Sequence, residues 1–186
     1  MKEASKAMAR RGEEFVKYFK GSGIDVGCGP DSVAAWKWKF PKMKSVREWD
    51  LADGDGELLA SVGDMSVNWV HSSHSLEHMR SWSNALRNWT RVCVRGGYVI
   101  CTVPSWEMYE HRTWPSRFNS DHKWAFSLVE HGGPVVLLSK EVLSSFGSVE
   151  VLREITDGYN PLDNRDQTAL PGLAVECCIE FVLRVK

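Results

Sequence analysis

The residues best suited to chemistry lie in the run Gly23 to Pro30. Two glycines, Gly27 and Gly29, follow a short apolar segment, and Asp25 stands two residues before the first of them. Glycines at the end of a strand let the backbone approach a ligand closely. Ser32 occupies the position of the third glycine in a dinucleotide fingerprint, which argues against a nicotinamide cofactor. The Asp25 carboxylate is suited instead to a ligand's ammonium group.

Polar side chains also end the other strands that we predict. Asp50 lies 21 residues beyond Gly29, close to the spacing at which an acid accepts hydrogen bonds from ribose hydroxyls. His71 and Ser72 end an apolar run that fits a buried central strand. Because the carboxyl ends of parallel strands share one edge of a sheet, we expect these groups to lie together. A turn-capping role is the alternative for Asp50.

The elements that position these residues form an α/β pattern. Helical segments alternate with strands, which predicts a parallel sheet with helices on both faces; the helices are 3–20, a short one that Asp31 or Ser32 caps and Pro41 ends, and 82–93, and the strands are 23–27, 46–50, 67–73 and 98–103. Apolar and polar residues alternate over 149–155 and 175–185, as in antiparallel strands. We predict a Rossmann-like, mostly parallel, doubly wound sheet with an antiparallel C-terminal strand.

One domain spanning 1–186, with an N-terminal helix within 1–20, fits this length. Basic and acidic residues number 23 and 24, so no global field favours nucleic acid. No apolar run reaches membrane-spanning length, and the first 20 residues lack a secretory signal. The five cysteines show no Cys-x-x-Cys spacing. We therefore expect a cytoplasmic protein that has no membrane partner, with nucleic acid disfavoured.

The segment 105–134 has no clear periodicity and is long for a connection, which predicts a lid or substrate insertion. Histidine suits proton transfer near neutral pH, and the candidates for a general base are His122, His111 and His74, in that order. Each of them could instead only hold its own loop by hydrogen bonds. The basic residues of the lid could bind an acidic acceptor or remain solvated; they are Arg112, Arg117 and Lys123.

Several motifs, in order, resemble those of class I S-adenosylmethionine-dependent methyltransferases of the type 11/12 kind: Gly23 to Pro30, Asp50, Gly54-Asp55-Gly56, Ser72 to His78, and Gly96-Gly97-Tyr98. The resemblance covers about residues 20–105. It implies S-adenosylmethionine as the cofactor and S-adenosylhomocysteine as the product. It also implies the contacts: Asp25 and the backbone of Gly27, Cys28 and Gly29 at the methionine end, Asp50 at the ribose, Leu51, Asp55 and Gly56 at the adenine, and His71 and Ser72 near the methyl group.

The spacing of two acids departs from the family pattern. Family members usually place a helix and a strand between the ribose acid and the adenine acid, but Asp50 and Asp55 are five positions apart. A crossover needs a dozen or more residues. We therefore expect the third strand-helix unit to be absent and the second strand to form a sheet edge. That edge could favour a dimer or be covered by a loop, so the chain is expected to be a monomer or homodimer.

His74, Glu77 and His78 fall at i, i+3 and i+4, which puts them on one helix face if a helix starts there. That spacing permits metal binding, and related ubiquinone-pathway methyltransferases carry an acid-rich version of the segment that is associated with a divalent ion. The alternative, which we favour, is that Glu77 caps or pairs locally and His78 packs beneath the cofactor. No metal is therefore expected.

The resemblance implies a methyltransferase that acts on a small-molecule acceptor through oxygen or nitrogen. One alternative is a non-catalytic module that binds the cofactor or its product and serves as a partner or regulatory subunit. A second alternative is a nicotinamide-dependent oxidoreductase, against which Asp25 and Ser32 both count.

Overall fold

The computed structural model describes residues 2–172 and 174–186. Its helices are α1 (Glu3–Arg10), α2 (Trp82–Val92) and α3 (Lys140–Ser144). Its strands are β1 (Gly21–Val26), β2 (Met43–Trp49), β3 (Val67–Ser73), β4 (Cys93–Pro104), β5 (Ala125–Ser127), β6 (Val135–Leu137), β7 (Ser148–Ile155) and β8 (Cys178–Arg184). Short 3-10 helices, among them Val33–Trp36 and Leu76–His78, join several of them.

Six strands form one sheet in the order β2-β1-β3-β4-β8-β7. Strands β2, β1, β3 and β4 are parallel, and β8 runs antiparallel to both of its neighbours. This confirms the predicted Rossmann-like sheet with an antiparallel C-terminal strand. Within the described residues, no strand lies between β2 and β3 in the chain, so β2 forms a sheet edge. The shortened Asp50–Asp55 connection accounts for that absence.

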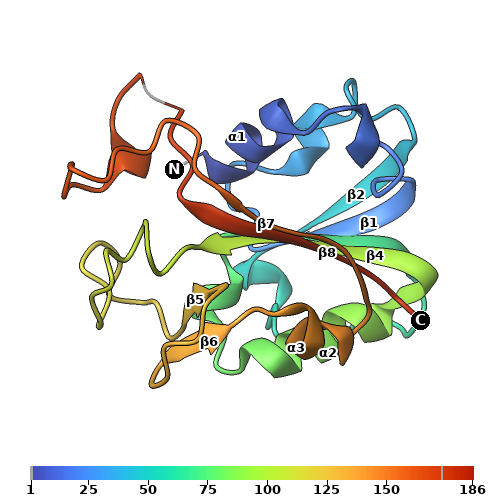
Figure 1. The fold of residues 1–186 in the computed structure, drawn as a ribbon. Coiled ribbons are helices and arrows are strands. Elements are labelled where there is room, and N and C mark those ends of the chain that lie inside the picture. Colours follow the sequence, from blue (N-terminus) through green and yellow to red (C-terminus); the bar gives the residue numbers. More distant parts are fainter. Residues whose placement is uncertain (1, 173) are drawn as a thin grey trace.

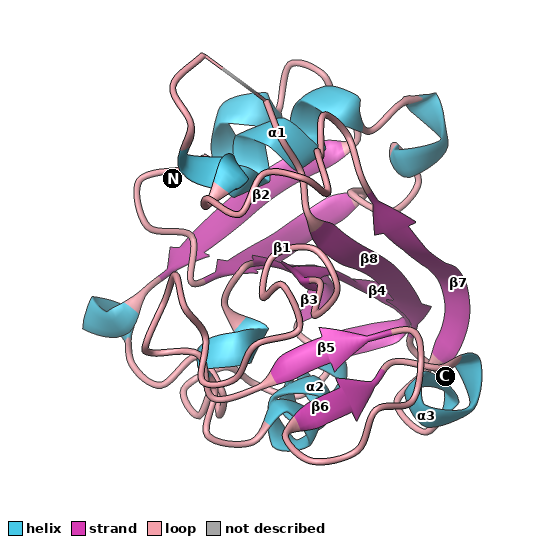
Figure 2. Cartoon of the chain, turned by 60° about the vertical axis from the view of Figure 1, so that its left-hand side comes forward, coloured by secondary structure: helices cyan, strands magenta, loops and turns pink. Residues whose placement is uncertain are grey.

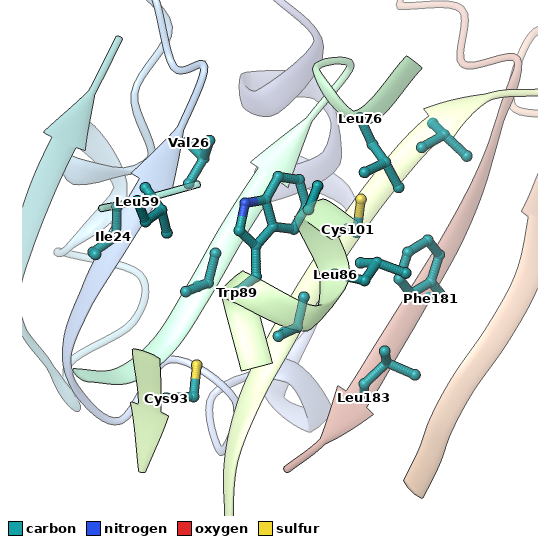
Figure 3. Packing of buried hydrophobic residues seen from close by; sticks show 14 of the residues in the cluster. Ile24, Val26, Leu59, Leu76, Leu86, Trp89, Cys93, Cys101, Phe181 and Leu183 are labelled. Carbon is teal, nitrogen blue, oxygen red and sulfur yellow. The ribbon is translucent and has the colours of Figure 1, made fainter. Parts of the chain in front are cut away.

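The sheet separates two apolar layers (Figure 1). Helix α1 and the turn at Val33–Trp36 cover one face, where Met8, Phe19 and Trp69 are buried. Helices α2 and α3 cover the other face (Figure 1). There Leu86 and Trp89 of α2 lie against the sheet (Figure 3).

Alternation along β3 decides which layer receives each polar residue. Trp69 packs in the α1 layer and Val70 packs in the α2 layer. Because successive strand residues point to opposite faces, His71 returns to the α1 side. Glu180 of β8 follows the same rule, since Phe181 lies in the α2 layer and Val182 in the α1 layer. A buried histidine and a buried carboxylate therefore share one face of the sheet.

The N-terminal helix is shorter than predicted, and residue 1 of the predicted span lies outside the described residues. Helix α1 ends at Arg10, and a separate 3-10 turn follows at Glu13–Phe15. The physical reason is Arg11, whose side chain is fully buried and whose Nε donates to Glu180 at 2.9 Å. Arg11 continues the buried face of Ala7 and Met8, and the backbone leaves the helix at this residue, whose ψ is 123°.

The segment 105–124 lies at one end of the sheet, where Figure 1 draws it in yellow-green. It continues into β5, which pairs with β6 as a two-stranded parallel ribbon. That ribbon lies on the same side of the sheet as α2 and α3 (Figures 1 and 2). No helix in the described part of the chain is long and apolar enough to span a membrane.

Candidate functional site

Two cavities open at the carboxyl ends of β1, β2, β3 and β4. The lid cavity, of about 270 Å³, is lined by the Gly27 turn and by lid residues that include Tyr109 and His122. The Asp50 cavity, of about 710 Å³, is lined by the end of β2 and by the segment after Asp50. Three residues line both cavities: Gly27, His74 and His78. The two spaces meet where an open parallel sheet places its ligand.

The turn after β1 places backbone at the junction of the cavities. Gly27 and Gly29 have φ angles of +69° and +48°. A Cβ on Gly27 would lie 2.0 Å from Ser75 Oγ, so glycine is required there both by conformation and by space. Cys28 lies between these two glycines. Burial, and after it the charge of Asp25, raises the pKa of its thiol to about 11. Cys28 therefore stays a thiol, and the predicted contact with its backbone remains a prediction.

Asp25 lines the lid cavity, and both of its carboxylate oxygens already have hydrogen-bond partners within the protein. Its Oδ2 accepts the Val33 amide at 2.8 Å, and its Oδ1 lies 2.7 Å from His71 Nδ1. Arginine can only donate, so His71 Nε2 accepts from Arg11 Nη1 at 3.1 Å and Nδ1–H must donate to Asp25. Burial lowers the pKa of His71 even though Asp25 opposes it. A neutral imidazole thus holds Asp25 in place and leaves lone pairs for a ligand's ammonium.

His71 and Ser72 are fully buried and neither lines a cavity. Ser73 and His74, the next two residues, line the lid cavity instead. The residues predicted to contact the ligand, His71 and Ser72, therefore lie one to two residues before those that line the cavity. The reason is that β3 continues to Ser73 before the chain reaches the open edge of the sheet.

The residues predicted for ribose and adenine line the Asp50 cavity: Asp50, Leu51, Asp55 and Gly56. Asp50 Oδ1 caps a turn by accepting the Leu51 amide at 2.8 Å, so the capping alternative and a ligand contact coexist. Leu51 is 94% exposed, free to pack on a flat ring. Asp55 accepts from the Glu57 amide and pairs with Arg80. Arg80 also lines this cavity and was missed, since nothing in its spacing marks it.

The segment predicted to be a lid is hydrogen-bonded to the turn at Leu76–His78. The carbonyl oxygen of Glu77 accepts from the amides of Lys123 and Trp124, at 2.8 and 3.3 Å. Trp124 Nε1 donates to the carbonyl oxygen of Met79 at 2.9 Å. These bonds fix His122 beside Glu77, 45 residues away in the sequence.

Two histidines and a buried carboxylate meet there. The Nε2 atoms of His78 and His122 lie 3.9 and 4.0 Å from Glu77 Oε1. Their Nδ1 atoms bond to Asp121 at 2.9 Å and to Glu110 at 2.6 Å. Because a carboxylate accepts at Nδ1, each ring presents the Nε2 lone pair toward Glu77. Burial, and after it Glu110, raises the pKa of Glu77 to about 8, and burial together with His122 lowers that of His78.

The three candidate bases are placed differently. His122 and His74 line the lid cavity, and burial lowers the pKa of His74 to about 3. His111 lies instead beside Phe118 and Tyr159, at ring-centroid distances of 5.7 and 6.4 Å, and lines neither cavity. His74 has a φ of +53° and precedes the 3-10 helix. The i, i+3, i+4 rule therefore does not apply to it, and His122 takes its place beside Glu77 and His78.

Comparisons with known proteins agree with this geometry. A family model described as a methyltransferase domain matches residues 33–101. A structure titled as a SAM-dependent methyltransferase from Archaeoglobus fulgidus is 16% identical, with a TM-score of 0.61, covering 99% of this chain and 94% of that one. No curated protein matches the chain.

Two further structures share the fold. A chain of the complex between the Haloferax volcanii Trm112 methyltransferase activator and a putative methyltransferase is 16% identical, with a TM-score of 0.58, covering 98% of this chain and 88% of that one. A possible histamine N-methyltransferase from Thermotoga maritima is 15% identical, with a TM-score of 0.56, covering 93% and 86%. The methyltransferase-domain match over residues 33–101 and the shared fold make the chain similar to class I S-adenosylmethionine-dependent methyltransferases.

Proposed function

We propose that the protein methylates a small molecule, at oxygen or nitrogen, held in the lid cavity. The observation that carries this is the meeting of two cavities at Gly27, His74 and His78. Their volumes of about 270 and 710 Å³ suit a cofactor with a second, smaller ligand. When bound, S-adenosylmethionine supplies an electrophilic methyl group on a sulfonium.

The residues present fit that cofactor. Asp25, fixed by His71, offers carboxylate lone pairs to an ammonium group in the lid cavity. Tyr109 is buried in the same wall and offers an aromatic face to a cation. Asp50, at the end of β2, caps its turn and also lines the Asp50 cavity, where its carboxylate can accept hydrogen bonds from ribose hydroxyls.

The remaining chemistry lies with the lid. Docking of Lys123 and Trp124 on Glu77 closes the cavity over the acceptor and excludes water. His122 lines this cavity with its ring fixed by Glu110 at Nδ1 and its Nε2 beside Glu77 in the cavity wall. Of the predicted bases, we retain His122 for contact with the acceptor and place His111 outside the site.

Replacement of Asp50 by alanine is expected to weaken S-adenosylhomocysteine binding tenfold or more, because it removes a charged acceptor of hydroxyl hydrogen bonds. Titration calorimetry of the wild type should give a micromolar dissociation constant. Asp50→Asn keeps an oxygen to cap the turn and should lose less than Asp50→Ala. Asp64→Ala, which removes an exposed carboxylate paired with Arg91, is the matched control.

The outcomes separate two claims. Absence of product binding by the wild type would overturn the proposed function. Equal binding by the wild type and Asp50→Ala would overturn only the assignment of Asp50 to the ribose.

A further inference from the structure

We propose that Glu77, His78 and His122 bind a divalent transition-metal ion in the wall of the lid cavity. The ligand atoms are Glu77 Oε and the Nε2 atoms of both histidines, and all of them lie within 4.8 Å of one another. All three residues line the lid cavity. This departs from the sequence expectation of no metal, which was based on Glu77 capping or pairing locally and on His78 packing beneath the cofactor.

The Glu77 carboxylate has no partner that would explain its burial. Its side chain is 1% exposed, and neither oxygen receives a hydrogen bond from the described residues. A buried carboxylate without a partner is costly. The Nε2 atoms of His78 and His122, 3.9 and 4.0 Å away, cannot donate to it while the rings are neutral with their protons on Nδ1. A cation bound between these three acceptors satisfies all of them at once.

Each histidine is oriented as a metal ligand is. Asp121 holds the far nitrogen of His78, and Glu110 holds that of His122. Such carboxylate-histidine pairs fix the tautomer and the ring orientation in metal sites. Glu110 is 1% exposed, so the second pair is deeply buried. With Glu77, three carboxylates surround the two histidines, and Lys123 neutralises only the outermost, Asp121.

The donor set selects the kind of ion. Two imidazoles and one carboxylate favour zinc, iron, cobalt or manganese over the oxygen-binding magnesium and calcium. Ligands of a tetrahedral ion with bonds of about 2.1 Å lie about 3.4 Å apart, so the ligand atoms, which lie within 4.8 Å of one another with two contacts at 3.9 and 4.0 Å, must move closer when the ion binds.

Three protein ligands leave an open position, as in catalytic metal sites. Here the open position faces the lid cavity, since every ligand lines it. The ion would hold an acceptor's hydroxyl oxygen there and lower its pKa. This step rests on the proposed function, and it favours an oxygen acceptor over a nitrogen acceptor.

The test is a titration of metal-free protein with Co²⁺, followed by its visible absorption, and with Zn²⁺ by calorimetry. We expect one ion per chain. Glu77→Gln, which keeps the shape of the side chain, and His122→Asn should weaken binding at least 100-fold. Asp121→Asn, at an exposed second-sphere position, should weaken it about 10- to 100-fold. His131→Asn is the matched control, because His131 pairs with Glu107 outside the cluster and should leave binding unchanged.

Equal affinity in the wild type, Glu77→Gln and His122→Asn would overturn the site, as would the absence of binding at millimolar metal. Circular dichroism and the melting temperature show whether each variant folds. If a variant at a buried position does not fold, the exposed variant Asp121→Asn still tests the site. Acetohydroxamate, a bidentate oxygen ligand, should shift the Co²⁺ spectrum; an unchanged spectrum would overturn the open position. Binding of S-adenosylhomocysteine to metal-free protein tests the proposed function separately.

Discussion

Replacement of Glu180 by glutamine is expected to lower the free energy of unfolding by about 3 to 5 kcal/mol, since breaking a buried ion pair leaves uncompensated charge. Glu180 is fully buried on β8 and accepts hydrogen bonds from three arginines. The distances are 3.1 Å from Arg10 Nη2, 2.9 Å from Arg11 Nε and 2.7 Å from Arg153 Nη2. Arg11 is itself fully buried and cannot turn to solvent.

Replacement of Glu180 should also weaken ligand binding at the cavity that Asp25 lines. Arg11 also donates to His71, which holds Asp25. A chain of polar contacts therefore runs from β8 through the N-terminal segment to the cavity. Disturbing Glu180 should weaken S-adenosylhomocysteine binding even though Glu180 lines neither cavity.

The effect of Glu180 should depend on pH. Burial alone would raise the pKa of Glu180, but Arg11 and Arg10 lower it from an ordinary 4.5 to about 2. A lowered pKa in the folded state stabilises the protein fully above about pH 4.5, and this contribution is lost as the pH falls toward about 2. The wild type and Glu180→Gln should therefore converge in stability over that window.

Urea denaturation at neutral and acidic pH measures both effects. Glu150→Gln is the control, because Glu150 pairs at 3.4 Å with the exposed Lys17 and should leave the denaturation midpoint unchanged. If Glu180→Gln were as stable as Glu150→Gln at pH 7, the burial of Arg11 would not depend on Glu180.

The centre of the sheet could be predicted from the sequence because β3 and the second half of β4 are mainly buried, largely apolar runs. The predicted strand 67–73 coincides with β3, and the absence of a third strand-helix unit followed from the short distance between Asp50 and Asp55. Both inferences depend on local spacing, which buried parallel strands and crossover lengths constrain strongly.

The buried charges could not be predicted in the same way. Arg11 falls in a basic, amphipathic segment, where a charged residue indicates a solvated face. Its partner Glu180 is 169 residues away, inside an alternating strand. Only the folded sheet brings the two together, so no local pattern marks either one.

The lid cluster shows the same limit at the site. His122 was a candidate base, but its place beside Glu77 depends on hydrogen bonds from the backbone amides of Lys123 and Trp124. Every residue type except proline has such an amide, so the sequence does not indicate these bonds. Glu110, which orients His122, is 12 residues away on a segment without periodicity. The helical spacing placed His74 on one helix face with Glu77 and His78, but His74 has a φ of +53° and lies before the 3-10 helix.

Replacement of Gly27 by alanine is expected to weaken S-adenosylhomocysteine binding about 100-fold or more, equivalent to about 2.7 kcal/mol. Gly27 has a φ of +69°, and an added Cβ would lie 2.0 Å from Ser75 Oγ and 2.7 Å from Ser75 Cβ. The variant must therefore shift the turn or displace Ser75, which bonds to the carbonyl oxygen of Gly27 at 3.3 Å. Since Gly27 lines both cavities, either change narrows their junction.

Gly132→Ala separates backbone strain from the loss of space. Gly132 has a similar φ of +73°, but nothing lies within 4 Å of its added Cβ. Both variants should lose about 1 to 2 kcal/mol of stability from the left-handed backbone, and only Gly27→Ala should lose binding. Calorimetry for the product and urea denaturation for stability measure the two effects independently. Retained binding in Gly27→Ala would mean that the ligand does not cross the junction, and the cofactor would have to occupy the Asp50 cavity alone.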